Sequence, residues 1–148
     1  MQETTTHILV IANDAVEGRL HETIRVRADA RNVDLLVIAP APNSRLRHWL
    51  SDEDGARRGA TYRLVSWLEF FEREGIKAHG WVGDPDPLQA IGDGLHVFPA
   101  DEVAIATRPE GRPHRLTRDL VGRARARYAL PIYALGLDDA AVPQPIAA

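Results

Sequence analysis

Apolar residues along the chain follow two alternating patterns. Continuous apolar runs rich in branched residues are typical of strands covered on both faces, and the two clearest are His7–Ala12 and Val33–Ala39. Three further runs predict strands at Ile76–Val82, at Asp101–Thr107 and from Leu130 onward. The third strand has the weakest signal because it contains a glycine, which destabilises a strand interior. The sequence therefore predicts five strands.

Between these runs, apolar residues recur every three or four positions, which predicts amphipathic helices. The apolar stripes are Val16, Leu20, Ile24 and Ala28; Ala60, Leu64, Leu68 and Phe71, widened by Trp67; Leu88, Ile91, Leu95 and Phe98; and Leu116, Leu120 and Ala124. Gly75 is expected to end the second helix, and Asp84 or Asp86 to cap the third. Gly92 and Gly94 are expected at surface positions of the third helix, where each costs roughly 1 kcal/mol relative to alanine.

The order of these elements predicts an α/β fold. Strands that alternate with helices form a mainly parallel sheet with helices on both faces, because parallel neighbours need crossover connections. In such open sheets, ligands bind beyond the carboxyl ends of the strands. Four corners are therefore candidate binding positions: Ala12-Asn13-Asp14, Ala39-Pro40, Val82-Gly83-Asp84, and Thr107 to Arg112.

Length and composition limit the class of protein. The chain has 148 residues, which suits one domain, and residues 138–148 lack any periodicity, which predicts a flexible tail. The net charge of −3 argues against a dedicated nucleic-acid binder. No apolar run approaches the roughly 20 residues that a membrane helix needs, and the first residues lack the pattern of a signal peptide. We expect a cytoplasmic protein with no membrane or nucleic-acid partner.

No common catalytic or metal-binding motif is present. The six histidines show no HxH, HxxxH or HExxH spacing, and there is no cysteine to hold zinc. The three serines lie in no G-x-S-x-G elbow, and the chain contains neither a GxGxxG nor a Walker loop. We therefore expect no metal site and no catalysis.

One segment resembles a known family. The stretch "GDPDPLQAIGDGLHVFPADEVAIATRP" is similar to the third corner, the following helix and the fourth strand of the universal stress proteins, most specifically from Gly83 to Arg108. "HILVIAND" and "ALPIYAL" resemble the first and last strands of that family. The resemblance implies a three-layer, Rossmann-like open sheet of five parallel strands, of the adenine nucleotide alpha hydrolase-like type, in the order 3-2-1-4-5. It also implies a role in stress response, a frequent nucleotide site and frequent dimers.

The nucleotide motif of this family is altered here. Members that bind ATP carry glycine-x-x-glycine, nine residues, and then glycine followed by serine or threonine after the fourth strand. In this chain Gly111 remains, no second glycine follows at that spacing, and Arg118-Asp119 occupies roughly the place of the glycine-hydroxyl pair. The aspartate that usually follows the first strand corresponds to Asn13, with Asp14 one position later.

Arginines are concentrated where the glycines are missing. Arg108, Arg112, Arg115 and Arg118, together with His114, lie at or just before a predicted helix start, where the helix dipole favours an anion. Arginine binds phosphate through paired charge-assisted hydrogen bonds, so this corner predicts a site for ATP, AMP or another phosphate-bearing ligand. The alternative is a solvated helix face, stabilised by an Arg115–Asp119 pair.

The candidate ligand-binding residues are Ala12, Asn13, Asp14, Ala39, Pro40, Gly83, Asp84, Thr107, Arg108, Gly111, Arg112, Arg115 and Arg118. Asp84 has a simpler alternative role as a turn residue. A rival hypothesis assigns no small ligand to the protein. It is then a dimeric interaction module, in which the last strand, Ile132 to Leu137, pairs with its copy across a sheet edge.

Overall fold

Eight helices and strands lie within the residues that the computed structural model describes, which are 5–13, 32–41, 53–106 and 114–135. In chain order these elements are β1 (Thr6–Ala12), β2 (Val33–Pro40), α3 (Glu53–Arg73), β3 (Lys77–Gly83), α4 (Pro87–Val97), β4 (Glu102–Ala106), α5 (His114–Arg127) and β5 (Ile132–Leu135). The predicted first helix and the predicted tail lie outside the described residues.

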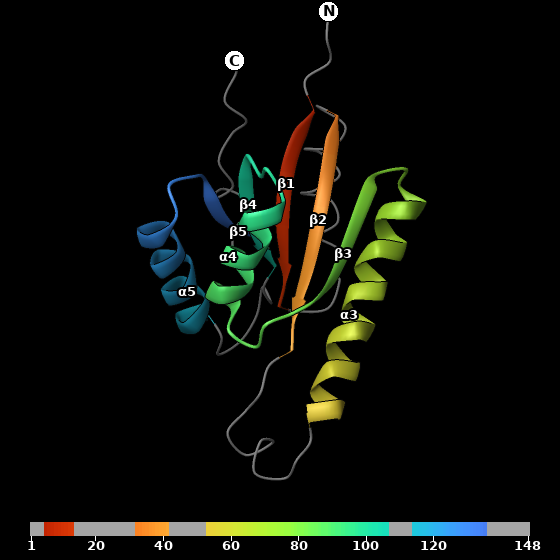
Figure 1. Cartoon of the computed structure of the whole chain (residues 1–148), viewed down its shortest axis with the longest axis horizontal. Helices are drawn as coiled ribbons and strands as arrows, with labels where there is room; N and C mark the ends of the chain where they lie inside the picture. Colours follow the sequence, from red (N-terminus) through yellow and green to blue (C-terminus); the bar gives the residue numbers. More distant parts are fainter. Residues whose placement is uncertain (1–4, 14–31, 42–52, 107–113, 136–148) are drawn as a thin grey trace, which may run out of the picture.

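The five strands form one parallel sheet in the order β3-β2-β1-β4-β5 (Figure 1). The strand order implied by the resemblance is therefore confirmed. β1 lies between β2 and β4, and its last residue, Ala12, is in register with Ala106. Pro40 at the end of β2 is in register with Gly83 at the end of β3. The carboxyl ends of these strands consequently lie at one edge of the sheet.

The central strands are buried on both faces, as their continuous apolar runs predict. One apolar layer packs strand residues against α3, and it includes Ile8, Val10, Leu35, Val37, Ala104, Tyr133, Leu64, Trp67 and Phe71. The other packs strand residues against α4 and α5, and it includes Leu9, Ile11, Leu36, Ile38, Val103, Ile105, Leu88, Ile91, Val121 and Ala124. Successive strand residues alternate between the two layers, which gives the three-layer architecture. The described helices include none long and apolar enough to cross a bilayer.

The glycine that weakens the strand signal in the sequence lies inside β3 for a structural reason. A Cβ atom at Gly80 would collide with the main-chain carbonyl of Val37 in β2 and would lie 3.0 Å from a methyl group of Leu64 in α3. Glycine therefore permits β3 to approach both its neighbouring strand and its covering helix.

Gly75 ends α3 as predicted. Its φ of 72° is in the left-handed region, which glycine adopts without a Cβ clash. The Gly75 N–H donates to Glu72 O (3.1 Å), and the Ile76 N–H donates to Phe71 O (2.9 Å). These two bonds form a Schellman motif, in which the chain leaves the helix and enters β3.

Asp84 and Asp86 both have structural roles in the turn before α4. Asp86 is the N-cap, and its side chain accepts from the Leu88 N–H at 3.0 Å. Asp84 accepts from the Asp86 N–H at 2.9 Å, which closes the preceding turn. Pro87 occupies the first helical turn, where its missing N–H has no cost.

The expectation that Gly92 and Gly94 lie on the surface is wrong. A Cβ atom at Gly94 would lie 2.8 Å from Ile38 Cδ1 and 3.1 Å from both methyl groups of Leu9, so α4 rests directly on the sheet there. At Gly92 a Cβ atom would lie 2.7 Å from the Tyr128 hydroxyl, which donates to the Leu88 carbonyl at 3.0 Å. Helical periodicity alone does not reveal such close approaches.

We expect Gly94→Ala to lower the free energy of unfolding by about 1–2 kcal/mol, because overpacking of a closed interface outweighs the better helix propensity of alanine. Gly122→Ala in α5 is the matched control, since a Cβ atom there meets nothing within 4 Å. That variant is expected to gain about 0.5–1 kcal/mol. Urea unfolding of both variants measures the difference, and equal gains in the two would contradict the close packing of α4.

Candidate functional site

The carboxyl edge of the sheet brings together most of the candidate residues that the structure describes. β1 ends at Ala12 and is followed by Asn13, β2 ends at Pro40, and β3 ends at Gly83, followed by Asp84. Figure 1 shows these strand ends together with the amino ends of α3 and α4 at the bottom of the view. Polar main-chain groups and helix starts thus face the same region, which is the usual ligand position in an open parallel sheet.

Two of the corners are tied to each other. The Ala41 N–H, just beyond β2, donates to Gly83 O at 3.4 Å, so the ends of β2 and β3 stay in contact after the regular ladder stops. A Cβ atom at Gly83 would collide with a methyl group of Ile38. Ala39 and Ala12 are fully buried, so they offer small size and main-chain atoms rather than side-chain chemistry.

An arginine that the sequence analysis did not select reaches this edge. Arg63 Nη2, in α3, donates to Pro40 O at 2.7 Å, and the side chain is half-buried. The bond anchors a guanidinium group at the end of β2, next to one of the predicted corners. In the sequence, Arg63 stands next to Leu64, at the border of the apolar stripe of this helix. A long cationic side chain at such a position can cover apolar surface with its stem and reach a polar group with its charged end.

The remaining candidates are only partly described. Asp14, Thr107, Arg108, Gly111 and Arg112 lie outside the described residues. Arg115 and Arg118 lie within α5, as the predicted stripe of Leu116, Leu120 and Ala124 implies, but their side chains are outside the described part. β4 pairs with β1, and Ala106 at the end of β4 is in register with Ala12, the residue before Asn13.

The described residues at this edge form no metal centre. Among the described residues, no three histidine, cysteine, aspartate or glutamate side chains are placed to hold a metal ion. The side chains of Asp86 and Asp84 cap the helix and close the turn, respectively.

Comparisons with known proteins support the fold. No protein-family model matches the chain, and no curated protein matches its sequence. A universal stress protein from Archaeoglobus fulgidus superposes with a TM-score of 0.63 at 17% identity, over 88% of this chain and 98% of that protein. A universal stress protein family member from Arabidopsis thaliana, with AMP bound, superposes with a TM-score of 0.59 at 13% identity, over 95% of this chain and 97% of the other.

The chain has the universal stress protein fold. The resemblance that the segment around Gly83 indicated is therefore confirmed for the fold. An Archaeoglobus fulgidus universal stress protein in complex with dAMP also superposes, with a TM-score of 0.57 at 18% identity over 88% of this chain and 97% of that protein. Two of these similar structures therefore contain an adenine nucleotide, and the names of all three refer to stress rather than to a reaction.

Proposed function

We propose that the protein is a divergent, non-catalytic member of the universal stress protein family that binds a phosphate-bearing ligand, with an adenine nucleotide as the first candidate. The ligand lies at the carboxyl edge of the sheet, against the corners that follow β1 to β4. The described part of this site consists of Asn13, Pro40, Gly83 and Asp84. The arginines that follow β4 in the sequence bind the negatively charged phosphate.

The observation that carries this proposal is that the guanidinium of Arg63 lies at the edge where the carboxyl ends of β1, β2 and β3 meet. The guanidinium of Arg63 is fixed to the carbonyl of Pro40, and β4, which precedes the arginine-rich segment in the sequence, pairs with β1. Arginine can partly replace the phosphate-binding main-chain N–H groups of a glycine-rich loop, because its planar guanidinium presents paired hydrogen-bond donors to a phosphate. The nucleotides in two similar structures support the choice of ligand.

We infer no catalysis, because the described corner residues offer no nucleophile beside a base. Asp86 is occupied as a helix cap and Asp84 holds the turn, while Ala12, Pro40 and Gly83 carry no reactive group. The site fits binding and signalling better than turnover.

Isothermal titration calorimetry with AMP, ADP, ATP and adenosine tests the proposal. We expect at least one phosphorylated nucleotide to bind, with an affinity that falls as salt increases, and adenosine to bind more weakly because it lacks the charge that the arginines answer. The absence of heat and of a thermal shift with every nucleotide would refute the ligand part of the proposal.

A second candidate function is a homodimeric interaction module, and the position of β5 favours it. Within the described residues, β5 is the last strand of the sheet and pairs with β4 alone, and an edge strand of this kind is a template for a second copy. Because the Val103 N–H donates to Pro131 O (2.9 Å), the alternation along a parallel strand directs the main-chain N–H of Ala134 away from β4.

Sedimentation of the wild-type chain is expected to show a dimer, and Ala134→Pro to weaken it at least about tenfold, because proline removes an outward donor without removing one from the β4–β5 ladder. The unfolding midpoint of the monomer serves as the folding control. A wild-type monomer at high concentration would exclude this second function and leave nucleotide binding untouched.

A further inference from the structure

β3 lies at the opposite end of the sheet from β5. Among the described strands it pairs with β2 alone, so the β2–β3 ladder uses the main-chain groups of only one of its two edges. β3 has seven residues, whereas β5 has four, and Lys77, His79 and Trp81 of β3 are exposed. A long edge strand is a ready template for pairing with another chain.

One hydrogen bond shows which main-chain groups of β3 point away from the sheet. The Ala41 N–H donates to Gly83 O at 3.4 Å, so the main chain of Gly83 is directed toward β2. Because this direction alternates along a strand, Ala78, Gly80 and Val82 direct their N–H and C=O groups away from β2. Antiparallel pairing of two β3 strands centred on Gly80 satisfies all three residues at once. Ala78 then pairs with Val82 of the second copy, and Gly80 pairs with its own counterpart.

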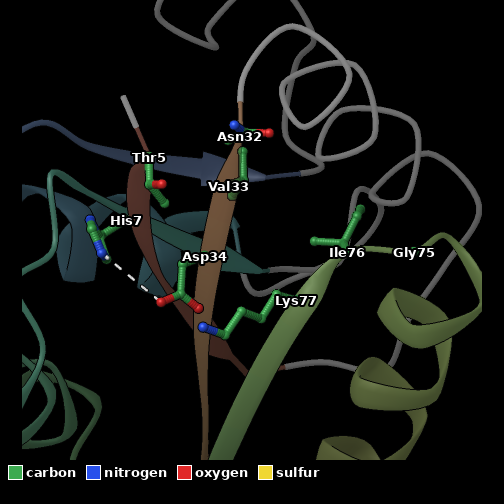
Figure 2. A pocket seen from close by; sticks show the side chains of 8 residues that line it. All are labelled: Thr5, His7, Asn32, Val33, Asp34, Gly75, Ile76 and Lys77. Carbon is green, nitrogen blue, oxygen red and sulfur yellow. Dashed lines mark ion pairs between the residues drawn. The ribbon is translucent and has the colours of Figure 1, made fainter. Parts of the chain in front are cut away.

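The side chains of β3 are compatible with this register. Lys77 lies opposite Gly83 of the second copy, which has no side chain, and His79 lies opposite Trp81. A lysine on an edge strand usually hinders pairing. Here the side chain of Lys77 extends toward Asp34 of β2, with which it is in register, rather than past the edge (Figure 2).

α3 has an apolar flank at the same level of the strand. Arg63 lies on the flank of α3 that reaches β2, and Leu64 packs against Gly80 of β3. Because a helix turns once in about 3.6 residues, Leu68 and then Val65 lie further round in the same direction, beyond β3. Val65 is 44% exposed and Leu68 is half-buried. An apolar flank therefore borders the edge of β3.

The charges on this flank are complementary to a second copy of the same helix. Arg58 and Glu72 are both exposed, and they lie about two helical turns before and after Val65, respectively. When two copies of α3 lie antiparallel with their Val65 residues together, Arg58 of each copy faces Glu72 of the other. Leu64, next to Val65, packs against Gly80, so the axis that centres the strands on Gly80 also centres the helices on Val65.

We propose that a second copy of the chain binds at this end of the sheet, with β3 paired to β3 and α3 in contact with α3 around one two-fold axis. The contact is self-complementary, as a two-fold interface requires. It uses the outward main-chain groups of β3 and covers the exposed side chain of Val65. It goes beyond the nucleotide site and is separate from the pairing considered at β5, because the two strands lie at opposite ends of the sheet.

Disulfide cross-linking tests the register of the strands. The chain has no cysteine, so His79→Cys and Trp81→Cys each introduce a single thiol. Opposed residues of an antiparallel pair have Cβ atoms about 4.5–5.5 Å apart, and a small shift brings two cysteines into disulfide range. We expect oxidation of a mixture of the two variants to give mainly a linked dimer with one chain of each. A mixture that is linked no more than either variant alone would contradict the pairing centred on Gly80.

Sedimentation in the Ala134→Pro background tests the helix contact, because this variant lacks the outward donor at β5. We expect association to persist at high concentration, and Arg58→Glu or Glu72→Arg to weaken it at least about tenfold, since each places like charges opposite one another. The chain with both substitutions exchanges the two charges and is expected to associate within about threefold of its parent.

Two exposed valines provide the matched control. Val65→Arg is expected to weaken association at least about tenfold, because it places two cations together on the axis. Val97→Arg makes the same change at a 66% exposed position on α4, in the other helix layer, and should leave association unchanged. The unfolding midpoint of each variant checks the fold. A monomer at every concentration in the Ala134→Pro background, or a charge-exchanged chain as weak as the single variants, would overturn the proposal.

Discussion

Replacing Gly80 with alanine is expected to destabilise the protein by about 3 kcal/mol, at the upper end of what overpacking costs. The added methyl group collides with the carbonyl of Val37, which is part of the main chain and cannot rotate away. The β2–β3 ladder or the position of α3 must shift instead, because the nearest methyl of Leu64 is already 3.0 Å from the added atom.

Urea unfolding followed by circular dichroism measures this effect. Gly122→Ala again provides the control, since it makes the same chemical change at an exposed helix position. A Gly80→Ala protein with a wild-type midpoint would mean that β3 does not approach β2 as closely as described.

Replacing Arg63 with glutamine is expected to weaken AMP binding by about 10- to 100-fold, the usual effect of losing a charge-assisted hydrogen bond to a ligand. This prediction depends on the proposed nucleotide site. The guanidinium is half-buried and fixed to the carbonyl of Pro40, so its charge is already positioned before a ligand arrives. Glutamine keeps a hydrogen-bonding side chain but removes the charge.

Arg57→Gln is the matched control, because Arg57 is exposed on the same helix and lies on a different side of it, six residues away. Titration calorimetry at fixed salt should give a change in the dissociation constant of less than about twofold for this variant. Equal weakening in both variants would show that only the general charge of α3 matters, and no weakening in either would remove Arg63 from the site.

Much of the fold was predictable because parallel strands and their covering helices leave distinct apolar patterns. The runs around Val10 and Val37 marked strands buried on both faces, and Gly75 marked the end of α3 through its left-handed conformation. The strand order came from the family resemblance instead, since periodicity does not say which strands are neighbours.

Two glycines show that apolar periodicity does not predict close packing contacts between elements. A pattern of apolar residues places Gly94 on a helix but does not reveal that the helix touches Leu9 and Ile38 at that point. Gly80 weakened the strand signal locally, although the close approach of Val37 is what requires it. In both cases the deciding contact comes from a residue far away in the sequence.

The candidate site was predictable in outline because the carboxyl ends of parallel strands converge. Arg63 was missed because its partner, Pro40, lies 23 residues earlier and belongs to another element. The contact proposed at β3 was missed for a similar reason. It combines the main chain of β3 with one flank of α3, whereas a spacing motif detects only side chains that share one helix or strand.

The most direct test of the proposed nucleotide site is an NMR titration of ¹⁵N-labelled protein with AMP. We predict that amide signals change at the carboxyl edge, at Asn13, Ala41, Gly83 and Asp84, while those of Asn32 and Lys77 at the amino edge stay in place. Amide changes confined to the amino edge, or none at saturating AMP, would contradict a nucleotide site built from the carboxyl ends of the strands.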